Sequence, residues 1–489
     1  MRNLRNHKRG RHLVKGAENR GPVVAAPGPP LWRAQGVAFY GTPKAPTHAG
    51  SIERCVGKRV GCRWESLGAA PILAVPTITI CWERRPGVKH QYTAEQEAFR
   101  QEVIQFLKKE LPADWPKRAD GPGVGRLDAP EYDVDDETEA FRQQITRKVA
   151  DKGWLTMAWP VENGGKGATY MEQFIFNEAM ALYGAPNLGA RAVNMLAPPL
   201  SIFGTEEQKA EHLPGIASAK DRWAFGYSEP NAGSDLANVE TRAVRDGDEF
   251  VINGTKIWSS GAHKADKLGV LARTGNNEAK HRGLTYFLIE KKQVASGLTI
   301  LPLVNMYGQH GFNQIFFDDV RVPASCILGE ENRGWYVTMT FFDFERSNIG
   351  NVAGIRRVLN NLAGYCRETR RNGARIIDDV TVRNRLAERA IEVEVATYLS
   401  YAVIDQQSRG LIPGAEASAV KIYSTELSQR VSYTGTEIVG SLAHLRPESR
   451  RSVLYGTYSH PPVSATIAGG TSEIHRNVLA TRGLGLPRS

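Results

Sequence analysis

The sequence predicts a multidomain α+β protein, in which an N-terminal all-α domain and a C-terminal helical bundle flank a middle β-barrel or sandwich domain. Two changes of hydrophobic period lead to this prediction. Apolar residues recur with helical spacing from about residue 91, form short β-runs from residue 223, and return to helical spacing after residue 334. We therefore expect domains at residues 91–222, 223–333 and 334–489, preceded by an extension of residues 1–90.

The extension carries the positive charge of the chain. The 489 residues have a net charge of +10, yet residues 1–90 alone hold 16 Lys and Arg against 4 Asp and Glu. The remaining 399 residues sum to −2 and show no recognised nucleic-acid motif, so we expect no nucleic-acid partner. Because periodicity is missing, we expect a basic, disordered tail or translated sequence upstream of the true start, with an organellar transit peptide as the alternative.

Cysteine usage and hydropathy indicate the cellular compartment that the chain suits. Three of the five cysteines lie in the extension, which leaves Cys326 and Cys366. We therefore expect no disulfide framework and no metal site, and a reducing compartment fits best. The longest apolar run, 67–82, is broken by prolines and is too short to span a bilayer. A cytoplasmic protein is expected, or one of the mitochondrial matrix if residues 1–90 are a transit peptide.

The helical first domain begins with an N-cap at Thr93. Acidic residues follow the cap, and Val103 and Leu107 belong to an apolar stripe. Two glycine-rich segments, 121–126 and 159–169, match neither the dinucleotide fingerprint nor the phosphate loop, so a nicotinamide Rossmann enzyme is not indicated. Further helices are expected at 138–152, 170–182, 188–203 and 206–217.

Short β-runs separated by turn signals extend from Trp223 to about Glu330 and predict the middle domain. Near its start, the segment YSEPNAGSD (227–235) is a loop by composition. Such a loop offers backbone N–H groups and two hydroxyls to an oxygen-rich ligand.

The segment after this loop predicts a β-hairpin. Two β-runs, Phe250–Ile252 and Lys256–Trp258, flank Asn253-Gly254, the dipeptide that best tolerates the positive φ of a type I′ turn. The second strand of this hairpin would bring Trp258 and Ser260 to a strand end near the loop. After Gly334, four helical segments are expected, at 334–372, 379–409, 414–442 and 472–482.

Three segments together resemble the acyl-CoA dehydrogenases: YSEPNAGSD (227–235), NGTKIWSS (253–260) and AGGTSEIHRN (468–477). The order of domains over residues 91–489 is similar too. The resemblance implies an FAD-dependent enzyme that carries out the α,β-dehydrogenation of an acyl-CoA thioester and passes the electrons to an electron-transfer flavoprotein. It also implies a homo-oligomer, either a dimer or a tetramer. A flavin oxidase or monooxygenase on the same fold, or a non-catalytic subunit of a heteromeric dehydrogenase, are the alternatives.

The resemblance also implies how the flavin is held. Ser228 falls where the family places a hydroxyl on the flavin pyrimidine edge, and Ser234 where a serine contacts the cofactor and the CoA side. Trp258 matches the tryptophan that packs against the flavin, and Ser260 the hydroxyl that faces flavin N5. The expected cofactor-binding residues are Phe225, Tyr227, Ser228, Gly233, Ser234, Trp258, Ser259, Ser260, Thr471 and Glu473.

The catalytic base is expected on a helix before the C-terminal motif. Many members of the family carry a glutamate directly before Gly-Thr-Ser, but here that position is Gly469. Isovaleryl- and long-chain-type members instead have the base directly before a helical arginine, and Glu345 occupies that position. Glu473, in the first turn of the next helix, is a poor substitute. The expected substrate-binding residues are Ser234, Asp343, Arg346 and Gly469.

Two family features that act across a subunit interface are changed here. Thr369–Gly373 replaces the usual Arg-x-x-Phe-Gly, and Glu437–Ser441 replaces the usual Gln-Ile-x-Gly-Gly. A heteromer in which only some subunits keep a full flavin site is therefore the alternative to a homo-oligomer.

Overall fold

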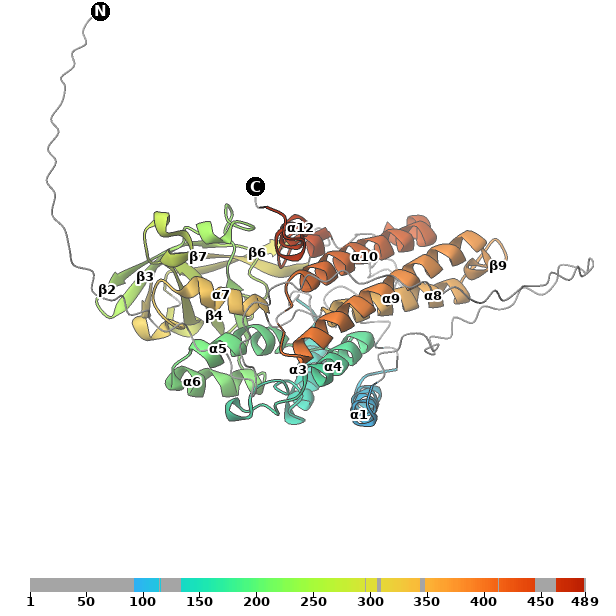
Figure 1. Ribbon diagram of the computed structural model, residues 1–489, viewed down its shortest axis with the longest axis horizontal. Coiled ribbons are helices and arrows are strands. Elements are labelled where there is room, and N and C mark those ends of the chain that lie inside the picture. Colours follow the sequence, from blue (N-terminus) through green and yellow to red (C-terminus); the bar gives the residue numbers. More distant parts are fainter. Residues whose placement is uncertain are drawn as a thin grey trace, which may run out of the picture. The chain divides into compact units, whose positions relative to one another are not determined.

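Figure 1 shows the computed structural model of the chain. It describes residues 92–113, 115, 133–294, 296–305, 309–343, 348–411, 413–444 and 463–487. The expected extension, residues 1–90, lies outside this part of the chain.

The N-terminal helices begin at side-chain caps. α1 (Ala94–Glu110), α4 (Tyr170–Tyr183) and α6 (Glu206–Ala217) each follow a threonine that forms a reciprocal capping box with the third helical residue. The predicted cap at Thr93 is thus confirmed, and α3 (Asp136–Asp151) follows a capping aspartate.

The helix expected at 188–203 is instead two pieces. A π-helical turn, Ala192–Leu196, leads into α5 (Ala197–Phe203). Pro198 and Pro199 open α5, because proline is tolerated in the first turn of a helix but supplies no N–H to a continuing one.

The middle domain is one seven-stranded sheet with the order β1-β4-β2-β3-β7-β6, and β5 pairs with β4. β1 runs parallel to β4, whereas the β2–β3, β3–β7, β6–β7 and β4–β5 pairs are antiparallel. The strands are β1 (Trp223–Gly226), β2 (Arg242–Asp246), β3 (Glu249–Lys256), β4 (Lys267–Arg273), β5 (Leu284–Glu290), β6 (Leu298–Val304) and β7 (His310–Pro323).

The predicted hairpin turn at Asn253-Gly254 is wrong. β3 runs through both residues, and its register with β7 shifts between Ile252 and Gly254, so the dipeptide forms a bulge. Gly254 has a φ of 146°, and a Cβ there would lie 2.6 Å from the Thr241 Cα. The hairpin turn lies earlier, at Gly247 between β2 and β3.

The C-terminal helices are α7 (Gly334–Asp343), α8 (Ile349–Glu368), α9 (Val380–Ser408), α10 (Ala415–Val439) and α12 (Ser472–Val478), with a π-helical turn at Leu479–Gly483. The helix expected at 334–372 is thus divided into α7 and α8, and Asn348, with a φ of 53°, precedes α8. After α8, β8 (Arg370–Arg371) and β9 (Ala374–Arg375) form a hairpin whose loop residues, Asn372 and Gly373, both have positive φ. Short 3₁₀ helices lie at Val161–Asn163, Leu236–Asn238, Asn277–Gly283, Lys291–Val294, Ala324–Cys326, Ile376–Asp378, Gly440–His444 and Val463–Thr466.

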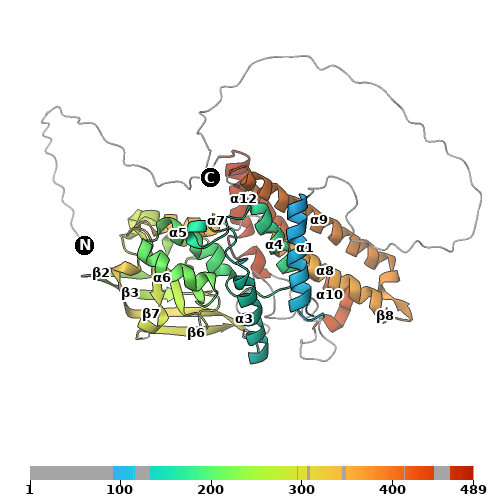
Figure 2. The same ribbon diagram turned by 90° about the horizontal axis from the view of Figure 1, so that it is seen from below.

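Helix α4 joins the N-terminal helices to the C-terminal bundle. Its Phe176 and Met180 belong to a buried cluster that extends over the N-terminal helices, α7 and part of the sheet. Its Phe174 and Ile175 belong to a second cluster with α8, α9 and α10; Figure 2 shows α4 beside these helices. A third cluster lies within the sheet. None of the described helices combines the length and apolar composition that a bilayer crossing requires.

The bulge in β3 leads to a prediction about Gly254. Gly254→Ala places a Cβ against the Thr241 backbone, so it should lower the free energy of unfolding by roughly 2–3 kcal/mol. Gly247→Ala is the matched control, because that glycine also has a positive φ but a Cβ there would meet nothing within 4 Å. The control should lose only about 1 kcal/mol. Urea unfolding followed by tryptophan fluorescence measures both, and equal losses would contradict the role of the bulge.

Candidate active site

The loop after β1 is anchored by a buried ion pair. Glu229 is 7% exposed and Lys256 is fully buried, and the Lys256 Nζ lies 2.8 Å from a Glu229 carboxylate oxygen. Lys256 also donates to the Tyr227 carbonyl at 3.0 Å. The Glu229 carboxylate accepts the backbone N–H groups of Glu240 and Thr241 at 2.6 and 2.9 Å. The loop, the segment before β2 and the end of β3 therefore meet at one carboxylate.

The pKa values of Glu229 and Lys256 determine how the contribution of this ion pair to folding stability depends on pH. Burial alone would raise the pKa of Glu229, but the charge of Lys256 and the donated hydrogen bonds outweigh burial and lower it. Burial lowers the pKa of Lys256 to about 8, and Glu229 opposes that shift. Both groups are therefore charged at neutral pH. Because the folded pKa of Glu229 is depressed, its contribution to stability is present above its unfolded pKa and is lost as the pH falls through the folded value.

The turn that follows β3 is held in an unfavourable conformation. Trp258 has a φ of 61°, in the left-handed region that bulky side chains avoid. Two backbone bonds from β7 hold the turn: the Ser259 N–H donates to the Asn313 carbonyl at 3.0 Å, and the Gly261 N–H donates to the Gly311 carbonyl at 2.8 Å. The Asn313 amide returns a bond of 3.0 Å to the Ser259 carbonyl. The Trp258 side chain remains 61% exposed.

The loop before α12 is held from α10. Lys421 donates to the Gly470 carbonyl at 2.5 Å, and burial lowers the Lys421 pKa to about 8 while Glu473 opposes the shift. A His475 ring nitrogen lies 3.1 Å from the Gly469 carbonyl. Gly469 and Gly470 both have positive φ, at 65° and 90°, and Thr471 caps α12. Contacts to carbonyl oxygens thus hold this loop.

An aromatic cluster holds α7 against the sheet. Phe341 of α7 lies within 6 Å, ring centroid to centroid, of Phe225, Tyr227 and Tyr286. The two tyrosine hydroxyls are 3.2 Å apart, and burial raises the pKa of Tyr227 well above its usual value. The side chains of Phe225 and Tyr227 therefore pack inward, against α7 and Tyr286.

The expected site residues that the structure describes lie mainly in the loop after β1, in the turn after β3 and in the segment that leads into α12. Ser228 meets the turn, because its carbonyl accepts the Ile257 N–H at 2.9 Å. Gly469, Thr471 and Glu473 lie on the α12 side, with Glu473 exposed in the first turn. Gly233 and Ser234 are exposed, and Ser260 is half-buried. Glu345 and Arg346, together with the Asp343 side chain, lie outside the described part of the chain.

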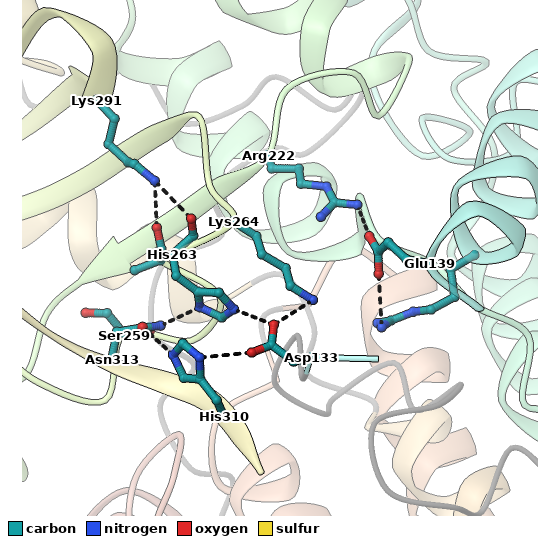
Figure 3. Close-up of polar contacts among 11 residues, drawn as sticks. Asp133, Glu139, Arg222, Ser259, His263, Lys264, Lys291, His310 and Asn313 are labelled. Carbon is teal, nitrogen blue, oxygen red and sulfur yellow. Dashed lines mark hydrogen bonds and ion pairs between the residues drawn. The ribbon is translucent and has the colours of Figure 1, made fainter. Parts of the chain in front are cut away.

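Sequence reasoning missed a polar network beneath the turn. Asp133, His263, His310 and Asn313 converge there, with Lys264 on the same carboxylate (Figure 3). Two histidines could have indicated this network: His263, shortly after the turn that follows β3, and His310, at the start of β7.

This network does not suit a metal ion. Single ligand atoms of Asp133, His263 and His310 lie within 4.8 Å of one another. However, the Lys264 ammonium is 3.1 Å from the same Asp133 carboxylate and would repel a cation. Each ring nitrogen also has a protein partner, namely Asp133 or Asn313. We therefore assign the network to hydrogen bonding.

The turn and the α12 loop each carry groups that suit a flat ligand with polar edges. The Ser259 and Ser472 hydroxyls are buried and have no hydrogen-bond partner among the described residues, a pattern that calls for an explanation such as a polar ligand. Trp258 presents an exposed indole, and a Cβ on Gly469 or Gly233 would meet nothing within 4 Å. These residues would suit a flavin.

A helical domain, a seven-stranded sheet and a helical bundle define the architecture of the acyl-CoA dehydrogenases. Three family descriptions match the chain in that order: the acyl-CoA dehydrogenase N-terminal domain over residues 93–220, the middle domain over 224–320 and the C-terminal domain over 332–484. The chain belongs to the acyl-CoA dehydrogenase family, whose members are oxidoreductases.

Individual relatives match over most of their length. FadE26 of Mycobacterium tuberculosis is 33% identical over 408 residues, covering 81% of this chain and 98% of the relative. The solved "Tcur3481-Tcur3483 steroid ACAD" is 34% identical with a TM-score of 0.71, covering 82% of this chain and 99% of that one. The ChsE4-ChsE5 complex from M. tuberculosis is 32% identical with a TM-score of 0.70, covering 82% and 100%.

The ion pair beneath the loop leads to a second prediction. Lys256→Met leaves the Glu229 carboxylate buried without its counter-charge, so the free energy of unfolding should fall by about 3–5 kcal/mol. Lys256→Met combined with Glu229→Gln removes the uncompensated charge and keeps an oxygen for one of the two N–H groups, because Glu240 and Thr241 donate to different carboxylate oxygens. The double variant should recover part of the loss in urea unfolding. A double variant less stable than Lys256→Met would show that the charge is not the cause.

Proposed function

We propose that this protein is an FAD-dependent acyl-CoA dehydrogenase that converts an acyl-CoA thioester to the 2-enoyl-CoA and passes the electrons to an electron-transfer flavoprotein. The bound flavin would accept the hydride from the β-carbon. The residues of the chain would supply the rest: a base for the α-proton, N–H donors for the thioester carbonyl, and a wall that orients the cofactor. The bacterial relatives favour a cytoplasmic enzyme over a mitochondrial one.

We assign the base to Glu345. The observation that carries this assignment is the glycine at position 469, where a Cβ would meet no described residue within 4 Å and φ is 65°. The position of the alternative base therefore holds no side chain. Helix α7 is described as far as Asp343, Glu345 comes two residues later in the sequence, and Phe341 keeps that helix against the sheet.

The thioester carbonyl would be held by the Gly469 N–H. His475 and Lys421 engage the carbonyls of Gly469 and Gly470, at 3.1 and 2.5 Å. These bonds fix the two peptide groups that follow Gly469, whereas the Gly469 N–H belongs to the peptide group before it. A donor fixed before substrate arrives is the condition for stabilising charge that develops in the transition state. Asp343 and Arg346 would meet the CoA portion, as would Ser234.

We further propose a bulky, ring-bearing acyl group. The support is the likeness to a structure described as a steroid ACAD, together with the small side chain of Ala468 beside the proposed carbonyl donor. Initial rates with CoA thioesters of linear, branched and steroid-side-chain acids, in the presence of an artificial electron acceptor, test this choice. Preference for a short linear acyl group would refute it.

An oxidase on the same fold is the second candidate. One similar structure is the prolyl acyl carrier protein oxidase AnaB, 25% identical with a TM-score of 0.65, covering 81% of this chain and 100% of that one. Stoichiometric oxygen consumption on addition of substrate would favour this candidate. Reduction of an artificial acceptor without oxygen uptake would favour the dehydrogenase.

Assembly with another subunit is supported by an apolar strip on the C-terminal helices. Ile391, Val395 and Tyr398 of α9 are 65%, 40% and 46% exposed and share one helix face, and Tyr433 of α10 is 55% exposed. We propose that this strip contacts a second copy of the chain. Light scattering should give a dimer or tetramer; Ile391→Glu should shift the mass toward the monomer, whereas Val380→Glu, at an exposed position at the start of the same helix, should not.

The changed interface motifs make a heteromer the alternative to a homo-oligomer. The β8–β9 hairpin replaces one of these motifs and contacts the other, because Arg371 donates to the Ile438 carbonyl at 2.6 Å. Two similar structures also carry paired names, Tcur3481-Tcur3483 and ChsE4-ChsE5. A purified chain that remains a monomer and binds no FAD until a partner is added would favour this alternative.

The assignment of Glu345 leads to a prediction about catalysis. Glu345→Gln keeps size and polarity but removes the base, so flavin reduction by acyl-CoA should slow by about 10²–10⁴-fold, while FAD stays bound. Glu206→Gln is the matched control, because the exposed Glu206 pairs with Lys209 on α6 and is not an expected site residue; it should reduce its flavin at close to the wild-type rate. Rapid-mixing measurement of flavin bleaching tests both variants. If Glu345→Gln is as fast as wild type, the base lies elsewhere; if wild type binds no FAD, the proposed function itself fails.

A further inference from the structure

Four side chains close a chain of hydrogen bonds beneath the Trp258 turn (Figure 3). Asp133, just before α3, contacts His263 at 3.0 Å through one carboxylate oxygen and His310 at 3.0 Å through the other. Asn313 contacts the remaining ring nitrogens, that of His310 at 2.8 Å and that of His263 at 3.1 Å. The same Asn313 donates to the Ser259 carbonyl at 3.0 Å. Asn313 thus links this closed ring of hydrogen bonds to the backbone of the turn.

The Ser259 carbonyl determines the direction of every bond in this ring. A carbonyl only accepts, so the Asn313 atom that faces it is the Nδ2 amide nitrogen. The second hydrogen of that nitrogen points to His263 Nδ1, which must therefore accept. His263 is consequently neutral, and its Nε2–H donates to Asp133. Burial lowers the pKa of His263, in agreement with a neutral ring.

The same logic requires His310 to carry two ring protons. Its Nε2 faces Asn313 Oδ1, which only accepts, and its Nδ1 faces an Asp133 oxygen. Asp133 is ionised: burial acts to raise its pKa, but the bonds from His263 and the charge of Lys264 lower it below its usual value. Both ring nitrogens of His310 must therefore donate, so His310 is an imidazolium. The rings of His263 and His310 stack with their centroids 3.9 Å apart. Because only one of the two rings is charged, the stack avoids the repulsion between two cations.

We propose that Asn313 and His310 are positioning residues: the His310 imidazolium orients the Asn313 amide, and that amide holds the Trp258–Ser260 turn in the conformation that binds FAD. The inference rests on the proposed function. If His310 loses a proton, one of its two acceptors loses a donor, and the Asn313 amide is then held by the Ser259 carbonyl and His263 alone. The bond from Asn313 to the turn, which opposes the strain of the positive φ at Trp258, is weakened as a result. FAD binding should therefore weaken as the pH rises.

The other charged groups around the two rings are few in the described part of the chain. Lys264 pairs with Asp133 at 3.1 Å. Lys291 donates to the Ala262 and His263 carbonyls at 2.9 and 3.4 Å. Glu139 is held by Arg222 and Arg142, and it feels the charge of Lys264. Histidine is the residue type of this set whose unperturbed pKa lies near neutrality.

The test is the pH dependence of FAD affinity in the full chain. The FAD dissociation constant is measured by quenching of flavin fluorescence from about pH 5.5 to pH 8.5, a range that includes the unperturbed histidine pKa of about 6.5. In wild type the dissociation constant should rise about tenfold toward high pH, the effect of losing one hydrogen bond of ordinary strength. His310→Gln and Asn313→Ala should bind weakly at every pH, with a flat profile.

His281→Gln is the matched control, because that histidine packs on Trp335 and is not part of the network; it should keep the wild-type profile. A His310→Gln profile with the wild-type slope would overturn the inference while leaving the proposed function intact, whereas absence of FAD binding by wild type would refute the proposed function. Stoichiometric bound metal whose removal by a chelator releases FAD would also overturn the inference. If the variants do not fold, ¹⁵N-histidine NMR of wild type decides: one imidazolium protonated at both nitrogens is expected near neutral pH, and a full set of neutral rings would contradict it.

Discussion

The ion pair between Glu229 and Lys256 is the constraint on which the site depends. A loop rich in Pro, Asn, Gly and Ser makes few regular backbone bonds, so it needs a fixed partner to hold one conformation. The Glu229 carboxylate supplies that partner through two backbone N–H groups and one ammonium. Full burial makes the pair costly to break, because either charge left alone would remain in a low-dielectric interior. Stability and placement of the loop are therefore coupled.

The remaining parts of the site are each held by a different element. β7 holds the Trp258 turn, α10 holds the glycines before α12, and the aromatic cluster holds α7. The turn is held through the Ser259 and Gly261 N–H groups and the Ser259 carbonyl, whereas the loop before α12 is held at its carbonyls and α7 through ring contacts. The exposed indole of Trp258 is left for a ligand. A site assembled in this way is rigid where chemistry requires fixed dipoles, and it carries backbone strain at Trp258 that neighbouring bonds must offset.

Local patterns predicted elements well where the signal was long. The helical period placed α4 and α6 close to their observed ends, and the Thr93 cap was predicted from its own side chain. The shorter signals failed: Asn253-Gly254 carries the turn dipeptide, but β7 pairs with β3 on both sides of it and makes it a bulge. The helix expected at 188–203 failed for a similar reason, since apolar spacing continues through a π-helical turn and two prolines.

The sequence by itself determined the family architecture, the three motif segments and the glycine at position 469, because each is a matter of residue type and order along the chain. Only the tertiary structure decided which polar groups meet. Asp133 is 130 residues from His263 and 177 residues from His310, and no periodicity connects positions so far apart. The protonation of the two histidines is likewise a property of the closed ring of contacts. It follows from one carbonyl that can only accept, and that carbonyl reaches Asn313 only when the turn packs on β7.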